Sequence, residues 1–246
     1  MLRRITADLH LHTCLSPCAD LLMSPRAVAE RSAQLGLELI AVCDHNSAEN
    51  AAAAIRAGRR YGVEVIPGME ITSREEAHLL GLFPSVDAAL EVQEVIHGAL
   101  PWENDPDKFG QQIVADDQDN VEAFNPRLLL GATTLSVEEV VGLIRRAEGL
   151  AIASHIDRGE YSIISQLGFL PPTLRLDALE VSYVLGLRRG REIYGKYGLP
   201  LVCSSDAHAP EEIGRGGLQI ECAAAGFKEL RLALAGESGR RIVAPE

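Results

Sequence analysis

The sequence lacks any apolar run that approaches the roughly 18 residues of a membrane-spanning helix. Its N-terminus carries Arg3 and Arg4 and continues directly into a strand-like stretch, a pattern unlike that of a secretory signal. The five cysteines are an odd number and contain no Cys-x-x-Cys pair, which argues against a disulfide framework and against a structural zinc ribbon. We therefore expect a cytoplasmic protein with reduced thiols and no membrane partner.

Basic and aromatic residues are also scarce. The chain has 23 lysines and arginines against 35 acidic residues, a formal charge of −12, and only 4% of its residues are aromatic. This charge repels a phosphate backbone at long range, so we expect no binding to duplex DNA. The sequence also lacks the basic track with aromatic residues that binds long single strands. A small phosphorylated substrate or a short oligonucleotide remains compatible with the charge.

Internal repeats and low-complexity tracts are absent, and 246 residues with 47% hydrophobic content are sufficient for one large core. Short apolar runs alternate with helical stretches of about 10–15 residues, which predicts parallel βαβ units. The expected strands are 5–11, 37–43, 63–66, 78–83, 150–153, 178–181, 199–203 and 217–221, and the expected helices are 25–36, 47–61, 85–100, 136–149, 186–197 and 227–235. We predict one α/β barrel domain that spans residues 1–246.

Capping residues mark where several helices begin. Ser24 followed by Pro25 is typical of an N-cap and a first helical position. Ser47 is expected to cap the alanine-rich helix, and Ser136 with Glu139 forms a capping box. These signals predict the starts of three helices.

One segment does not fit the β/α alternation. Residues 102–122 contain seven acidic residues against one lysine, and Pro101 and Pro106 interrupt any long helix. We expect an excursion from the barrel at about 101–130, with a hairpin around 112–115. It is either a solvated loop or a lid over the site.

Histidines gather at the ends of expected strands. His10 and His12 alternate along the first strand, so both side chains point to one face and can share a metal ion. Six of the seven histidines lie at or just past a strand end, namely His10, His12, His45, His78, His155 and His208. The seventh, His97, falls inside an expected helix and is predicted to be structural.

Carboxylates accompany these histidines. Glu70 follows the third expected strand, and Asp206 lies two residues before His208. Asp8 and Asp44 flank ligand-type histidines and are expected to orient imidazole N–H groups. The C-terminal strand ends of a parallel barrel meet on one face, and imidazoles mixed with carboxylates suit zinc, manganese or iron. We therefore predict a metal cluster there, suited to the hydrolysis of phosphate esters.

In order along the chain, these motifs resemble the PHP (polymerase and histidinol phosphatase) domain family of metal-dependent phosphoesterases. The matching motifs are Asp8-Leu9-His10-Leu11-His12, Asp44-His45, Gly68-Met69-Glu70-Ile71, His78, Ser154-His155 and Ser205-Asp206-Ala207-His208. The resemblance covers nearly the whole chain. It implies a distorted (β/α)7 barrel that holds two or three divalent ions, zinc, manganese or iron, in a cleft at the strand C-termini.

The resemblance also implies a ligand set for each ion. His10, His12, Glu70 and Asp206 would hold the first, Glu70 would bridge to a second held by His78 and His155, and His45 and His208 would bind a third. The family usually places another third-site ligand, Asp or His, five or six residues after His12, where this chain has Pro17 and Cys18. We predict Cys18 as that ligand, which would favour zinc or iron, with Asp20 as the alternative.

Three residues are predicted to be catalytic. Glu70 and Asp206 would hold the ions in place, and Arg158 would make a bidentate contact with the phosphate. A surface pairing of Arg158 with Asp157 or Glu160 is the alternative for that residue.

The predicted function is therefore that of a metal-dependent phosphoric ester hydrolase. A metal-bound hydroxide would attack small phosphomonoesters or nucleotides. One alternative is an exonuclease that acts on short oligonucleotides. Another is a non-catalytic metal-binding accessory domain, although the chain has no room for a polymerase of its own.

Overall fold

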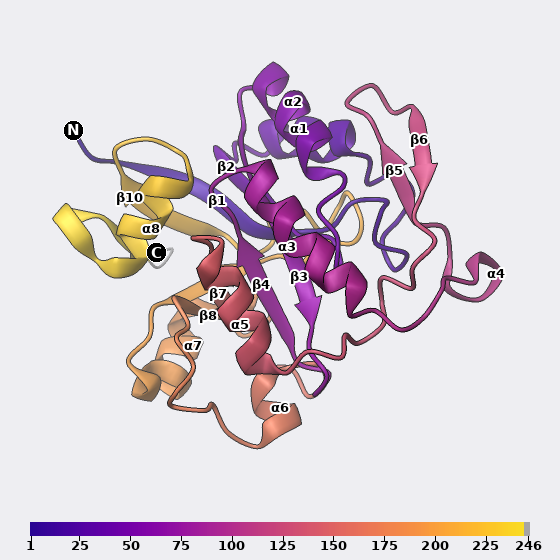
Figure 1. Ribbon diagram of the computed structural model, residues 1–246. Helices are drawn as coiled ribbons and strands as arrows, with labels where there is room; N and C mark the ends of the chain where they lie inside the picture. The colour runs from indigo at the N-terminus through magenta and orange to yellow at the C-terminus, as the bar shows by residue number, and fades with distance from the viewer. Residues whose placement is uncertain (244–246) are drawn as a thin grey trace.

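Seven strands form a nearly closed barrel in the computed structural model, which describes residues 1–243 (Figure 1). In order around the barrel they are β1 (Arg3–Leu11), β2 (Leu39–Val42), β3 (Glu64–Thr72), β4 (His78–Leu82), β7 (Leu150–Ala153), β8 (Ala178–Ser182) and β9 (Leu201–Ser204). β9 approaches β1 where the His12 N–H donates to the Ala207 carbonyl at 3.0 Å. The predicted distorted (β/α)7 barrel of the α/β class is confirmed.

The fourth strand runs against its neighbours. β4 is antiparallel to β3, with Thr72 paired to His78, and it is also antiparallel to β7. Residues 73–77 are too few for a helical crossover, so the chain turns back as a hairpin. The expectation of parallel units is wrong at this point. His78 therefore begins its strand, yet it lies at the barrel end where the parallel strands finish.

Two further strands extend the sheet beyond β1. β10 (Leu218–Cys222) pairs antiparallel with β1, and β11 (Arg241–Val243) pairs antiparallel with β10. The helix α8 (Phe227–Ala235) packs against both. The expected strand at 217–221 is thus present, but it extends the sheet outside the seven-stranded ring.

Helices cover the outer side of the barrel (Figure 1). They are α1 (Pro25–Gln34), α2 (Ala51–Tyr61), α3 (Val86–Gly98), α5 (Val137–Arg146), the short α6 (Ile163–Leu167), and α7 (Gly186–Tyr194), which continues as η1 (Gly195–Tyr197); η2 (Glu237–Gly239) follows α8. As predicted, Ser24 caps α1, and Ser136 forms a capping box with Glu139 at the start of α5. The prediction for Ser47 is wrong, because its hydroxyl donates to Gln93 and α2 begins only at Ala51.

None of the helices within residues 1–243 combines the length and the apolar character needed to cross a membrane. This agrees with the expected absence of a membrane-spanning segment. The cytoplasmic location stays a prediction.

The barrel strands are buried on both faces. Every residue of β2, β4, β7, β8 and β9 is buried, because helices cover the outside and side chains fill the inside. The larger apolar cluster includes Leu9, Ile71 and Leu179, and a smaller one under α1 and α2 includes Val28 and Ile40. Charged groups are rarely buried in such a core unless they are paired or bind metal, so those at the strand ends indicate a functional site.

The acidic excursion contains α4 (Pro106–Phe109) and a two-stranded sheet of β5 (Ile113–Ala115) and β6 (Val121–Phe124), which confirms the predicted hairpin. Two buried asparagines fasten it to the barrel. Asn50 bonds twice to the backbone of β5, and Asn46 donates to the Leu129 carbonyl at 2.8 Å. Leu130 lines the pocket at the strand ends. The segment is therefore a fixed wall beside this pocket.

Candidate metal centre

Histidine and carboxylate side chains converge where the parallel strands finish. They come from β1, β3 and β4 and from the segments that follow β1, β2, β7 and β9. All eight imidazole and carboxylate residues predicted to bind metal meet here: His10, His12, His45, Glu70, His78, His155, Asp206 and His208. A pocket of about 360 Å³ opens onto this group. His97, in α3, belongs to none of the described donor groups.

The first donor group consists of His10, His12, Glu70 and Asp206. Nε2 of His12 lies 3.1 Å from Oδ1 of Asp206, and Nε2 of His10 lies 3.3 Å from the same oxygen. Both nitrogens also lie 3.5 Å from an oxygen of Glu70. These are the four residues predicted for the first ion, and their ligand atoms all fit around one point.

The second donor group shares Glu70 with the first. Nδ1 of His78 lies 3.0 Å from Oε1 of Glu70, and Nδ1 of His45 lies 3.3 Å from Oε2. His155 approaches Oε1 with its Nε2 at 3.2 Å. The second donor group thus consists of His45, Glu70 and His78. Glu70 contacts both histidines predicted for the second ion, but His155 lies outside the group and His45 takes part in it.

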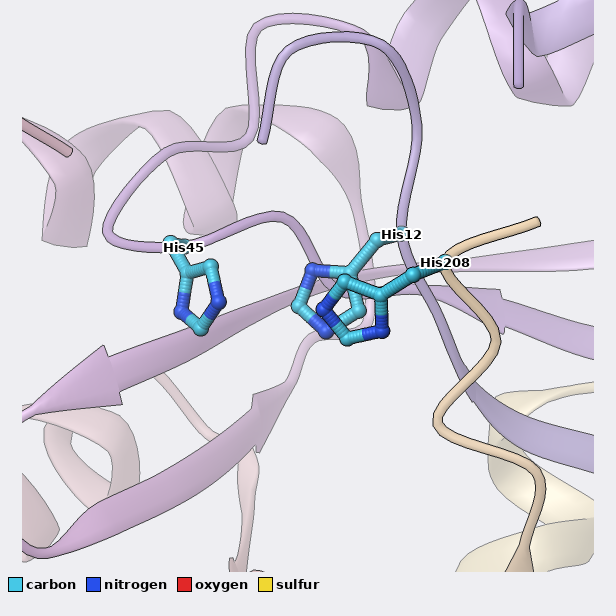
Figure 2. Close-up of side chains that lie close together, drawn as sticks. All are labelled: His12, His45 and His208. Carbon is cyan, nitrogen blue, oxygen red and sulfur yellow. The ribbon is translucent and has the colours of Figure 1, made fainter. Parts of the chain in front are cut away.

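The third donor group is made of three imidazoles, His12, His45 and His208. Figure 2 shows the rings of His12 and His208 overlapping, with His45 to one side. The ring centroid of His12 lies 4.2 Å from that of His208 and 4.6 Å from that of His45. The sequence predicted His45 and His208 together but did not predict that His12 would join them. This group contains only nitrogen ligands, which suit a transition metal better than a hard cation.

Neither of the two candidate extra ligands belongs to the third group. Cys18 lines the pocket together with His45 and His208. Its side chain is exposed at this pocket, where desolvation by the surrounding protein and the carboxylates of Glu70 and Asp206 raise the pKa of the thiol to about 12. Asp20 is exposed, and its carboxylate accepts the N–H of Leu22 in its own loop. Cys18 as a ligand stays a prediction, and it is the better placed of the two.

We expect the substitution Cys18→Ser to lower the metal content by about one ion per chain. The reason is that the thiol lines the same pocket as the His45 and His208 imidazoles. Elemental analysis would measure the change in metal content. The sulfur-to-metal charge-transfer absorption band of the cobalt-substituted protein would report whether the thiol binds the ion. Asp20→Asn is the matched control and should retain the full content. Loss of the ion in Asp20→Asn with no change in Cys18→Ser would reverse the assignment.

Several ligands sit on strained backbone. Asp206 has φ +51°, His155 has φ +25°, and Asn46, next to His45, has φ +50°. Non-glycine residues rarely adopt these values, and such strain concentrates at functional sites. Hydrogen bonds hold it in place, as where the Asn46 N–H donates to the Glu70 carbonyl at 2.8 Å. The backbone is thus bent to aim these side chains inward.

The charges of the site are arranged for cation binding. Burial raises the pKa of Glu70, but the imidazoles of His78 and His10 outweigh burial and hold this pKa well below its usual range. Burial and the neighbouring His208 lower the pKa of His12 to about 4. Burial likewise lowers the pKa of His45 well below its ordinary value. At neutral pH Glu70 is therefore a carboxylate, and His12 and His45 are neutral, the protonation states that metal ions require. His10 is the exception, because the carboxylates of Glu180, Asp206 and Glu70 outweigh its burial and raise its pKa well above the ordinary value.

The unpaired atoms of the site fit a metal as well. Nδ1 of His45, of His78 and of His155 is buried and has no hydrogen-bond partner. The first two face the carboxylate oxygens of Glu70 without the geometry of a hydrogen bond. Buried polar atoms are costly when unpaired, and a divalent cation between imidazole and carboxylate would satisfy them. The residues present therefore fit divalent ions.

Sequence analysis missed one buried carboxylate, Glu180 on β8. It is 1% exposed, and its Oε2 lies 3.0 Å from Nδ1 of His10 and accepts the N–H of His155 at 3.1 Å. A carboxylate in this position fixes the tautomer and orientation of a metal-binding imidazole. The available signal was a lone acid in the middle of the apolar run 178–182.

Asp44 orients the His12 imidazole through the hydroxyl of Ser16. It accepts the hydroxyl proton of Ser16 at 2.7 Å, and the Ser16 oxygen lies 2.9 Å from Nδ1 of His12. The same oxygen accepts the N–H of His45 at 3.1 Å. Asp44 therefore orients His12, as expected, but does so through Ser16, and the same serine also fixes the backbone of His45.

Asp8 has a different role from the one expected. Its carboxylate accepts the N–H groups of Ser205 and Gly214 at 3.0 and 2.9 Å. It therefore shapes the segment that carries Asp206 and His208, and the expectation that it orients an imidazole is wrong.

Arg158 lines the pocket and pairs with a predicted metal ligand. Its guanidinium lies 2.6 Å from Oδ2 of Asp206. Asp157 is engaged elsewhere, because it accepts the N–H and hydroxyl of Ser182. The surface pairing with Asp157 or Glu160 is therefore wrong, and the guanidinium lies against a residue of the first donor group.

Two family models match this chain. One, described as PHP domain, matches residues 8–162, and another, described as PHP-associated, matches residues 186–236. Because the matches cover separate ranges, a single domain over residues 1–246 stays a prediction.

Curated relatives match parts of the chain. An uncharacterised protein of Methanocaldococcus jannaschii is 30% identical over 139 residues, which are 48% of this chain and 81% of that protein. A 5′-3′ exoribonuclease of Haemophilus influenzae is 31% identical over 97 residues, 36% of this chain. The aligned part is only 34% of the exoribonuclease.

Solved structures share the fold over nearly the whole chain. The lesion-specific endonuclease Q of Pyrococcus furiosus has a TM-score of 0.70 at 19% identity, covering 98% of this chain and 58% of its own. A proposed metal-dependent phosphoesterase of Bifidobacterium adolescentis has a TM-score of 0.61 at 19% identity, covering 94% and 96%. At these identities the likeness establishes the fold alone.

The PHP domain match begins at Asp8, the first residue of the Asp8-Leu9-His10-Leu11-His12 motif, and ends beyond His155. It covers more than half of the 246 residues. The resemblance inferred from the sequence is thereby confirmed. The chain belongs to the PHP domain family of metal-dependent phosphoric ester hydrolases.

Proposed function

We propose that the chain hydrolyses small phosphomonoesters or nucleotides with two to three divalent ions, of zinc, manganese or iron. The observation that carries this proposal is the set of three overlapping donor groups beside Arg158. Glu70 and His12 are each shared between two groups, which suits ions only a few ångströms apart. Ions held in this way would activate water and neutralise charge on the phosphoryl oxygens.

The chain's own residues supply the rest of the site. Glu70 and Asp206 are the catalytic carboxylates of the proposal, because Glu70 belongs to two donor groups and Asp206 completes the first. Arg158 offers a planar guanidinium to the phosphoryl oxygens. The pocket volume of about 360 Å³ lies at the lower end of the range for small-molecule sites, which favours a substrate no larger than a nucleotide.

A second candidate is a nuclease that acts on short oligonucleotides. The exoribonuclease relative favours it, and so does the fold shared with endonuclease Q. Endonuclease Q has also been solved with a 27-mer duplex that carries an abasic lesion, so the comparisons give no support to the expected absence of duplex DNA binding. The charge of −12 still argues against long duplexes.

A substrate panel would test the proposal. The protein loaded in turn with zinc, manganese or iron would be assayed against phosphomonoesters, short labelled single strands and a duplex with an abasic site. We expect phosphate release from monoesters, with Asp206→Asn as the inactive control. Cleavage of the strands without monoester hydrolysis would favour the nuclease. Inactivity on every substrate, with metal bound, would leave the non-catalytic accessory role.

We expect Arg158→Ala to retain its metal but to lose roughly 10- to 150-fold in kcat/KM on phosphomonoesters, the effect of one charge-assisted hydrogen bond. The guanidinium would touch the substrate and is not among the donor groups. Steady-state kinetics with metal analysis would measure both properties. The control is Arg145→Ala, which removes a partly exposed arginine of α5 that pairs with Asp177. An unaffected kcat/KM in Arg158→Ala would remove the phosphate-binding role.

A further inference from the structure

Tyr161 stands at the mouth of the pocket and is fixed to a metal-ligand residue in two ways. Its carbonyl accepts the N–H of His78 at 2.8 Å. Its ring stacks on the His78 imidazole, with centroids 4.7 Å apart and an interplanar angle of 19°. The aromatic ring is therefore held in direct stacking contact with His78, a member of the second donor group.

The backbone at Tyr161 is strained. Its φ of +57° is rare for a bulky aromatic residue, and the contacts with His78 keep it there. The residue nevertheless remains 46% exposed and lines the pocket. Part of an immobilised aromatic ring is thus open to whatever enters the site.

The outer part of the pocket has little charge with which to recognise a substrate. Arg158 is the only basic side chain among the pocket residues other than histidines, and it stands at the ions. Glu160, at the mouth, disfavours a second phosphate by repulsion. The remaining large side chains there are Leu130 and Tyr161, which offer an apolar and an aromatic surface.

We propose that Tyr161 is a specificity-determining residue that stacks on a nucleobase, so that the substrates are nucleoside phosphates and not base-free sugar phosphates. This inference rests on the proposed function. A phosphate held at the second donor group would lie next to His78, and the group it carries would then extend over the neighbouring tyrosine ring. Stacking of one base on an aromatic side chain corresponds to roughly 5- to 150-fold in binding.

A matched pair of substrates tests the inference. Adenosine 5′-monophosphate and ribose 5-phosphate have the same phosphoester and sugar and differ in the base. We expect the wild type to prefer the nucleotide, and Tyr161→Leu to lose about tenfold or more in kcat/KM on the nucleotide alone, mainly through KM. Tyr161→Phe should keep the preference. Tyr183→Leu changes a tyrosine of similar exposure outside the pocket and should alter neither substrate.

The failures can be told apart. An equal loss on both substrates in Tyr161→Leu, with reduced metal content, would mean that the tyrosine only supports His78 and would overturn the inference. Equal use of both substrates by the wild type would overturn it as well. Inactivity on both would reject the proposed function instead. In that case calorimetric binding of the two compounds still decides, because only stacking makes the nucleotide bind more tightly.

Discussion

Glu70→Gln is expected to abolish phosphate release and to reduce the bound metal. Glu70 is 1% exposed, and its two oxygens lie within 3.5 Å of five imidazole nitrogens. Glutamine has the same shape but removes the charge and turns an N–H donor toward some of these nitrogens. The first and second donor groups would both lose their shared carboxylate. Phosphate release and elemental analysis would measure the effect.

Two further variants sharpen this test. Asp206→Asn should also abolish activity, because Asp206 completes the first donor group. Glu160→Gln makes the same chemical change at the pocket mouth, outside the donor groups, and should keep its metal. Full activity in Glu70→Gln would reject the shared-carboxylate mechanism.

Glu180→Gln should weaken metal binding by roughly 10- to 100-fold, the usual effect of removing a carboxylate behind a metal-binding imidazole. Glu180 contacts Nδ1 of His10 and the N–H of His155, so a single buried side chain fixes residues of the first and second sites. An amide cannot supply the negative charge that keeps the His10 Nδ1 protonated. Titration with cobalt, followed by absorption, would give the affinity of each variant.

The control for this variant is Glu221→Gln. Glu221 lies on β10 and pairs with Arg241 on the neighbouring β11, in the part of the sheet outside the seven-stranded ring. It should bind metal as the wild type does. Circular dichroism of both variants without metal separates a folding defect from a local one. Unchanged affinity in a folded Glu180→Gln protein would show that Glu180 plays no part in the metal centre.

Local patterns predicted much of this molecule. The alternation of His10 and His12 placed both on one face of a strand, and the ligand-type residues at strand ends predicted a metal cluster there. The resemblance to the PHP family supplied the four residues that form the first donor group. The reversal of β4 was not predicted, because the apolar pattern of a strand does not encode its direction. Only the short connection at 73–77 carried that information.

Features that depend on tertiary contacts escaped prediction. His12 joins the third donor group because β1 meets the segment after β9, a pairing between the two ends of the chain. Glu180 was overlooked because one acid in an apolar strand leaves the strand pattern intact. Serine is a residue typical of helix N-caps, but the Ser47 hydroxyl instead donates a hydrogen bond to Gln93, 46 residues away in the sequence.

The β3–β4 hairpin has a consequence for the order of assembly. Glu70 and His78 lie on adjacent strands joined by a tight turn, so their juxtaposition needs only a local loop closure. The first donor group instead joins β1 to Asp206, and it forms only when nearly 200 residues have folded between them. Contacts this distant in sequence form late. Metal binding by His10, His12 and Asp206 would therefore require the complete barrel, and an ion bound there would link the two ends of the ring.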